Sequence, residues 1–126
     1  MSPDGPLVEV WAAAINARDL DTLLEVAHPE IEVYPLQFGV TGHYAGRDGV
    51  RQWMTELREW DPGHRVRFEK TCEFGAGRVA LFGTVFIDDE PLSPYALVAE
   101  VRDGQVARMR SYLNDEETLQ KLGVLD

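Results

Sequence analysis

The spacing of apolar residues changes once along this chain, near Arg65, and this change limits the fold more than any other feature. Before that point apolar side chains recur every three to four positions, as in Leu7, Val10, Trp11, Ala14 and Ile15. After it they alternate with polar ones, as in Val66, Phe68, Cys72 and Phe74. The first spacing is typical of amphipathic helices and the second of half-buried strands. The sequence therefore predicts an α+β fold, with helices laid on one face of a curved, mostly antiparallel sheet.

Within the helical half, three helices and one short strand are expected. The first helix contains residues 7–15, and the second begins after Asp19 as N-cap and ends at His28, before Pro29. Residues 31–34 form a brief strand that Pro35 ends. A third helix begins near Arg47 and ends at the "DPG" of residues 61–63.

The second half predicts a four-strand meander and a closing helix. The strands are expected at residues 65–74, 78–87, 92–102 and 106–113, with the Asp-Gly of "RDGQ" forming the last hairpin turn. In the tail, Asn114 is the expected N-cap, Glu117 stands at the capping-box position, and Gly123 lies where a C-terminal cap belongs.

Composition excludes several classes of function. Twelve Lys and Arg against 22 Asp and Glu give a net charge of −10, which disfavours binding to nucleic acid and to anionic lipid. No segment resembles a signal peptide or a membrane span, so we expect a cytoplasmic protein with a single domain over residues 1–126. Cys72 is the only cysteine and the histidines lack metal-ligand spacing. We therefore expect no disulfide, no metal site and no cofactor.

Three stretches of the chain resemble a known family. They are "WAAAINARDLDTLLEVAHPEIEVYPL", "YAGRDGVRQWM" and "GQVARMRSYLNDEETLQKLG", in this order. They are similar to the SnoaL-like branch of the nuclear transport factor 2-like (NTF2-like) superfamily, which includes polyketide cyclases and ketosteroid isomerase. The resemblance implies a cone-shaped α+β barrel, in which the sheet curls around the first and third helices and encloses an apolar pocket. It also implies a small hydrophobic ligand and a homodimer formed through the outer sheet face.

The catalytic pattern of ketosteroid isomerase is absent from this chain. By the resemblance, its tyrosine donor falls on Trp11, its general-base aspartate on Tyr34, and its protonated aspartate near Leu97. A phenol is a poor base at neutral pH and a leucine donates no hydrogen bond. The chain is therefore not expected to be a steroid isomerase by that mechanism.

Other polar residues are candidates for catalysis. Glu32 and Tyr34 share one face of the short strand, and Ile31 and Val33 share the other. If the first face is turned inward, Glu32 is a candidate base, with a pKa raised by its apolar surroundings, and Tyr34 a hydrogen-bond donor. If the second face is turned inward, Glu32 is solvated. His43 lies where the chain would cross the pocket mouth, and contact with the pocket or an exposed loop position are both open.

For the remaining histidines, structural roles are the simpler explanation. His28 is interpreted as a cap for the second helix and His64 as a surface residue. The resemblance and the periodicity together predict pocket-lining residues, which are Trp11, Ile15, Phe38, Trp53, Met54, Leu57, Phe86, Tyr95, Leu97, Ser111 and Leu113. A buried Tyr95 would need a partner for its hydroxyl, and a ligand could be that partner. The expected subunit interface consists of Glu100, Arg102, Arg108, Arg110 and Tyr112.

These observations leave three functional hypotheses. The first is an isomerase or cyclase-type enzyme that moves a proton on a hydrophobic carbonyl compound, with Glu32 or His43 as base. The second is a ligand-binding or accessory protein without chemistry, and the third is a dimeric interaction module whose cone is filled by its own side chains. The interior discriminates between them, because the enzyme needs a titrating group that faces it.

Overall fold

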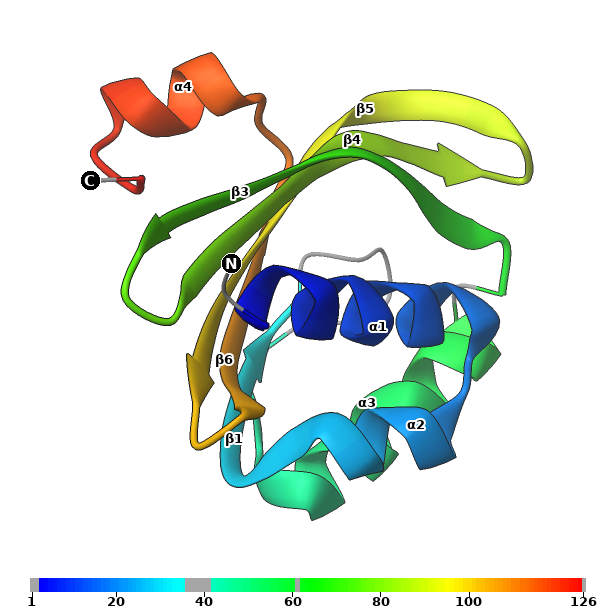
Figure 1. The fold of residues 1–126 in the computed structure, drawn as a ribbon. Coiled ribbons are helices and arrows are strands. Elements are labelled where there is room, and N and C mark those ends of the chain that lie inside the picture. The colour runs from blue at the N-terminus through cyan, green and yellow to red at the C-terminus, as the bar shows by residue number, and fades with distance from the viewer. Residues whose placement is uncertain (1–2, 36–41, 61, 126) are drawn as a thin grey trace.

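The computed structural model describes residues 3–35, 42–60 and 62–125 (Figure 1). Its helices are α1 (Asp4–Ala17), α2 (Leu20–Val26), α3 (Gly46–Trp60) and α4 (Glu116–Lys121). Its strands are β1 (Ala27–Tyr34), β2 (Tyr44–Ala45), β3 (His64–Gly75), β4 (Arg78–Ile87), β5 (Glu90–Arg102) and β6 (Gln105–Tyr112). The predicted α+β class is confirmed.

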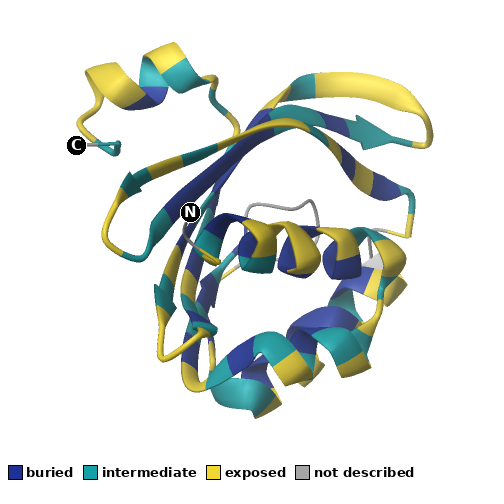
Figure 2. Cartoon of the chain, in the orientation of Figure 1, coloured by how far each residue is buried: buried dark blue, intermediate teal, exposed yellow. Residues whose placement is uncertain are grey.

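One curved sheet forms the frame of the molecule. Its strand order is β2-β1-β6-β5-β4-β3, and every neighbouring pair is antiparallel except β1 and β6. Strands β3, β4 and β5 arch over α1, while α2 and α3 lie beyond α1 on the same concave side (Figure 1). Figure 2 shows that the buried residues of the three helices face inward, toward one another and the sheet. The predicted cone of sheet around helices is therefore present.

The helix boundaries follow local chemistry. The Asp19 carboxylate accepts a hydrogen bond from the Thr22 backbone N–H and caps α2, as its sequence position predicts. In the tail the cap is Asp115, which accepts from the Thr118 N–H, so the assignment of Asn114 was wrong by one residue. Gly123 takes the expected left-handed conformation after α4, with φ of 76°.

Two strand predictions needed correction. β1 begins at Ala27 rather than at residue 31, so α2 ends at Val26 and His28 belongs to the strand. The two-residue strand β2 was not predicted at all, because a pair of residues carries no measurable alternation.

Side-chain bonds to the backbone fix α1 against the first strand of the meander. The Asn16 amide donates to the Val66 carbonyl oxygen at 2.7 Å and accepts from the Val66 N–H at 2.9 Å. Arg18, the C-cap residue of α1, donates to the carbonyl oxygen of His64 at 2.7 Å. The end of α1 is thereby held against the start of β3, where the interior described below begins.

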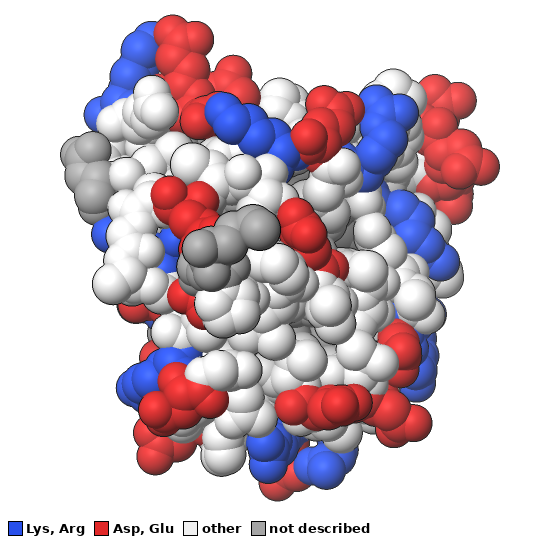
Figure 3. All heavy atoms as spheres, in the orientation of Figure 1, with Lys and Arg blue, Asp and Glu red and all other residues white. Residues whose placement is uncertain are grey.

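The outer face of the sheet is partly covered by the tail. Leu119 of α4 packs on Ala80, Phe82 and Ala96, and the four form a second, smaller hydrophobic cluster. Among the described residues, no helix is both long and apolar enough to cross a membrane. On the side seen in Figure 3, acidic and basic side chains alternate around an uncharged centre.

Candidate functional site

The interior of the cone is built from the inward positions of the helices and strands that surround it. Eight of the predicted pocket residues are buried there, and they are Trp11, Ile15, Trp53, Met54, Leu57, Tyr95, Leu97 and Ser111. All but Ser111 belong to the main hydrophobic cluster, together with Ile31, Val33, Leu81 and Met109. Inside this apolar wall the polar atoms are few, so each one affects what the interior can bind.

The first polar feature of the interior is a hydroxyl pair. The Tyr95 hydroxyl on β5 and the Ser111 hydroxyl on β6 share a short hydrogen bond in which either oxygen can be the donor. Tyr95 is 2% exposed and Ser111 is fully buried. Burial raises the pKa of Tyr95 to about 12, so its phenol stays protonated at neutral pH. The hydroxyl partner that a buried Tyr95 needs is therefore Ser111 of the chain itself, and not necessarily a ligand.

Gly83 on β4 leaves space beside the ring of Tyr95. Gly83 lies between Phe68 on β3 and Tyr95 on β5 in the strand register. Without a side chain at Gly83, the two flanking rings meet across β4, edge to face, with centroids 6.0 Å apart. A Cβ atom there would lie 1.9 Å from the Arg67 carbonyl oxygen. The ring of Tyr95 is thereby positioned by close packing of three strands.

The second feature is a pair of tryptophans without polar partners. Trp11 on α1 and Trp53 on α3 stack with ring centroids 6.1 Å apart, and both are fully buried. Neither indole N–H has a hydrogen-bond partner in the described part of the chain. A buried donor without an acceptor costs about 1–3 kcal/mol. Two such donors in one apolar interior therefore favour a ligand that supplies acceptors.

The third feature is His64, whose position corrects the sequence-based interpretation. His64 was expected on the surface but is 2% exposed, with its ring edge to face on Tyr95 at 6.5 Å. Its Nδ1 atom has no partner among the described residues. Burial, together with the charges of Arg18 and Arg65, lowers the pKa of His64 to about 4. The imidazole is therefore neutral at physiological pH.

A signal for His64 was present in the sequence. The alternation that marks β3 starts at Val66, and counting back two positions places His64 on the same face as Val66 and Phe68. The neighbouring "DPG" turn made the strand appear to begin later. The interior histidine was therefore missed because of a boundary error of one or two residues.

The three proposed catalytic residues do come together, but outside the cone. Ala27, Ile31 and Val33 are the fully buried residues of β1, so Glu32 and Tyr34 face the outer side of the sheet. His43 stacks on the Tyr34 ring at 4.5 Å and lies 3.5 Å from the Glu32 carboxylate. Tyr34 also donates to Glu32 at 3.5 Å. The interpretation with Glu32 facing the interior is wrong, since the apolar face of β1 covers the core.

Arginines of β6 complete this outer cluster. The guanidinium carbon of Arg110 lies 4.4 Å from the centre of the Tyr34 ring, and that of Arg108 lies 5.2 Å from it. Arg108 also pairs with Glu100 at 3.7 Å. The cluster is partly solvated, with the side chains of His43 and Glu32 43% and 46% exposed. It is therefore a polar surface patch rather than a water-excluded reaction site.

Of the other three predicted pocket residues, two lie outside the interior and one lies outside the described residues. Phe86 points to the outer face, where the Arg67 guanidinium carbon lies 5.2 Å from its ring centre. Leu113 follows the end of β6 and is 39% exposed. Phe38 lies outside the described residues. In the first two cases the alternation was extended past a bulge or past the end of a strand.

Hollows run along the outer face of the sheet. One groove of about 730 Å³ includes Glu30, Glu32, Arg78, Arg102 and Arg108 in its wall. A neighbouring hollow of about 210 Å³ shares Arg78, Glu100 and Arg108 and is also lined by Arg110 and Tyr112. The outer face thus carries local hollows lined by charges of both signs.

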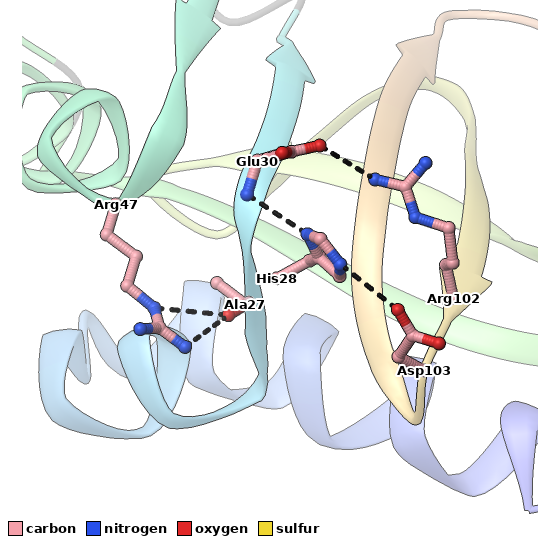
Figure 4. A network of polar contacts seen from close by, with 6 residues as sticks. All are labelled: Ala27, His28, Glu30, Arg47, Arg102 and Asp103. Carbon is pink, nitrogen blue, oxygen red and sulfur yellow. Dashed lines mark hydrogen bonds and ion pairs between the residues drawn. The ribbon is translucent and has the colours of Figure 1, made fainter.

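His28 belongs to a structural network (Figure 4). Its Nδ1 atom accepts from the Glu30 N–H at 3.0 Å, and its Nε2 atom lies 3.5 Å from the Asp103 carboxylate. Arg102 at the end of β5 pairs with Glu30 of β1 at 3.4 Å. The network joins β1 to the turn between β5 and β6, so a cap for α2 is not the role of His28.

The described residues hold no cluster of potential metal ligands. No group of three or more His, Cys, Asp or Glu side chains in these segments has a metal-binding geometry. Cys72 is half-buried and packs against the cluster under α4, away from the interior. The polar groups described in the interior are the Tyr95–Ser111 hydroxyl pair, the two indoles and His64.

Comparisons with known proteins agree with the fold described above. Residues 8–109 match the family model described as the SnoaL-like domain. No curated protein matches the chain significantly. TerC, crystallised with polyporic acid, is 20% identical with a TM-score of 0.76, over 98% of both chains.

Two further solved structures agree. An NTF2-like protein of unknown function from Burkholderia pseudomallei is 18% identical with a TM-score of 0.77, over 95% of this chain and 97% of that one. A candidate polyketide cyclase from Pseudomonas putida is 18% identical with a TM-score of 0.68, over 90% and 93%. At these identities the solved structures establish the fold. The family match over residues 8–109 confirms the resemblance stated above.

Proposed function

This chain belongs to the SnoaL-like family, and from that membership we propose that the interior of its cone binds a small, largely apolar molecule that carries hydrogen-bond-accepting oxygens. The observation that carries this proposal is the pair of buried, unpartnered indole N–H groups of Trp11 and Trp53. A carbonyl oxygen is an acceptor of the required kind.

Counting protons on the hydroxyl pair supports the same ligand class. Tyr95 and Ser111 hold two hydroxyl protons, and the bond between them uses one. Whichever oxygen donates, the other hydroxyl keeps a proton that can be given to a ligand. With the indole N–H groups of Trp11 and Trp53, the described part of the interior offers three donors to a ligand. These donors favour a ligand that presents oxygen acceptors.

The ligand of a protein with the same fold is consistent with this proposal. TerC was crystallised with polyporic acid, and the fold of this chain matches it along almost the whole length. The apolar wall of Ile31, Val33, Leu57, Leu97 and Met109 would supply most of the contact area of such a molecule. Binding without catalysis requires no residue beyond this apolar wall and the donors already named.

Removing one indole N–H at a time tests the binding proposal. We expect Trp11→Phe and Trp53→Phe each to weaken binding of the ketone 2-tetralone about fivefold, because one hydrogen bond contributes ~1 kcal/mol. Equilibrium dialysis measures this without relying on tryptophan fluorescence. Thr55→Val, which removes a donor from the exposed face of α3, is the matched control. Unchanged affinity in both tryptophan variants would contradict the proposal.

We also propose that the outer sheet face pairs with a second copy of the chain. The groove and the neighbouring hollow carry Arg78, Arg102, Arg108 and Arg110 beside Glu30, Glu32 and Glu100. A face with both charges can complement itself across a two-fold axis. Tyr112 and Val98 add apolar area between the charges.

A charge reversal on this face tests the dimer. The wild-type chain is expected to sediment with twice the mass of one chain, and Arg110→Glu is expected to sediment as a monomer, because a like charge then faces the acidic side chains of the partner. Arg51→Glu makes the same change of charge on the exposed side of α3 and should leave the dimer intact. A wild-type chain that stays monomeric at the highest concentration measured would refute the proposal.

The enzymatic hypothesis needs a base that reaches the interior. Proton transfer beside a carbonyl requires the base within hydrogen-bond reach of the carbon-bound proton, directly or through one water. Glu32 and His43 face the outer side of the sheet, so they do not meet this condition. If the chain is an isomerase or cyclase-type enzyme, its base is another residue.

A further inference from the structure

Arg110 on β6 carries a positive charge that no residue of the described chain neutralises. Within those segments its guanidinium takes part in no hydrogen bond or ion pair, and its Nε atom is buried. Arg108, two residues earlier on the same strand, is paired with Glu100 at 3.7 Å. Acidic residues outnumber basic ones by 22 to 12 in the chain, so a shortage of carboxylates does not explain the unpaired group. A buried N–H donor without an acceptor favours a ligand that brings one.

The ring of Tyr34 holds this guanidinium in place. The guanidinium carbon of Arg110 lies 4.4 Å from the centre of the Tyr34 ring, and the two residues are register partners on β6 and β1. The Tyr34 ring is itself stacked on His43 at 4.5 Å. A guanidinium over an aromatic ring keeps the N–H donors in its own plane for a planar acceptor. Arg110 is thus oriented without the use of its donors.

A hollow of about 260 Å³ lies beside Arg110, where β1 ends. It is lined by Tyr34, Pro35, Gly42, Arg110, Ser111 and Tyr112. The pairing of β1 with β6 stops at Tyr34 and Arg110, so Ser111 and Tyr112 are register partners of β5 alone. The hollow therefore lies on the side of β6 that a longer β1 would cover. Arg110 is the one charged residue among these described lining residues.

The remaining wall of the hollow is largely aromatic and apolar. Tyr34 and Tyr112 contribute phenol rings, and Pro35 contributes an apolar ring. Ser111 is fully buried and already bonded to Tyr95, so it closes the floor. The volume is just below the ~300–1,000 Å³ of most ligand pockets, which limits the occupant to a small molecule. One cation beside aromatic surface favours one negative charge on one ring system.

We propose that this hollow binds a small aromatic carboxylate, whose two oxygens accept from Arg110 and whose ring lies against Tyr34, Tyr112 and Pro35. A carboxylate is favoured over a phosphate because one guanidinium balances one charge, and its two oxygens match the guanidinium fork. Tyr34, and Arg110 over its ring, lie on the outer side of the sheet. The site is therefore separate from the interior, and the inference goes beyond the proposed function without depending on it.

Equilibrium dialysis of 2-naphthoate tests the site. We expect Arg110→Gln to weaken binding at least ~tenfold, because hydrogen bonds to a charged group are lost. Arg110→Lys keeps the charge but not the planar fork, so it should weaken binding by a smaller factor while preserving the charge on the proposed dimer face. The uncharged analogue 2-naphthamide should not distinguish Arg110→Gln from the wild type.

The matched control is Arg108→Gln, which removes the same charge from the same strand outside this hollow. Because the Arg108 side chain is exposed and its field is screened, we expect 2-naphthoate to bind this variant within about twofold of the wild type. An equal loss in Arg108→Gln and Arg110→Gln would overturn the proposal, since the charge of the whole face would then explain binding. Failure of the wild type to bind 2-naphthoate would overturn it directly.

Two further results would contradict this site by placing another group in it or the ligand elsewhere. Loss of 2-naphthoate binding in Trp11→Phe, with full binding by Arg110→Gln, would place the molecule in the interior. Binding that weakens as the protein concentration rises would mean that carboxylates of a second copy occupy Arg110, which also lines the neighbouring hollow. Binding of 2-tetralone reports on the interior, so its failure would refute the proposed function and leave this site standing.

Discussion

Gly83→Ala is expected to lower the free energy of unfolding by about 3 kcal/mol, because the added methyl group has no space between β3 and β4. Its Cβ would lie 1.9 Å from the Arg67 carbonyl oxygen and 2.8 Å from the Phe68 Cα. These are backbone atoms in paired strands, so relief requires the strands to separate. Urea unfolding followed by tryptophan fluorescence measures the loss as a shift of the midpoint.

Gly104→Ala is the matched control for this change. Gly104 has φ of +74° in the turn between β5 and β6, and a Cβ there meets nothing within 4 Å. Its substitution tests backbone strain without a steric clash and should cost only about 1 kcal/mol. If both variants lose the same stability, close packing at Gly83 is not what positions Phe68 against Tyr95.

The long elements of this fold were predictable from the sequence because their apolar periods are unbroken. The apolar stripe from Leu7 to Ile15 predicted α1, and the alternation from Val66 onward predicted β3. Caps were readable where one acidic side chain had one suitable N–H ahead of it, as at Asp19. At the tail, Asn114 and Asp115 were both able to cap α4, and the sequence alone did not decide between them.

The site was harder to predict, because a strand pattern tells which residues share a face and not which face is buried. For β1 the choice lay between Ile31 with Val33 and Glu32 with Tyr34, and the apolar pair covers the core. A one-residue error of face exchanges the interior and the surface completely. That is why the sequence placed Glu32 and Tyr34 on one face of the strand and left open whether that face lines the interior.

His64 shows the opposite case, a polar residue inside an otherwise apolar set. Residue type predicts a solvated histidine at a strand end, but the strand register places it beside Tyr95. Its burial is enforced by the bonds of Asn16 to Val66 and of Arg18 to His64, which close α1 over this end of the sheet. Contacts between segments about 50 residues apart in the sequence are not encoded in any local pattern.

The buried imidazole should also make the fold sensitive to acid. The pKa of His64 is lowered from 6.5 to about 4 by burial and by the nearby arginines. Between these two values the unfolded chain binds more protons than the folded one, so stability falls as the pH falls. The contribution is fully present above pH 6.5, is lost as the pH drops through 4, and amounts to about 3 kcal/mol at ~1.4 kcal/mol per unit of pKa.

Urea unfolding of the wild-type protein and of His64→Leu at pH 7, 5.5 and 4, spanning the window set by those pKa values, isolates this contribution. Carboxylates such as Asp19 and Asp115, whose pKa values are lowered by hydrogen bonds to Thr22 and Thr118, titrate alike in both proteins and cancel in the comparison. We expect the wild type to lose about 3 kcal/mol more than His64→Leu on acidification. Parallel losses would mean that His64 takes up its proton inside the folded protein as readily as in water. Such a histidine is solvated, and its burial beside Tyr95 would then be refuted.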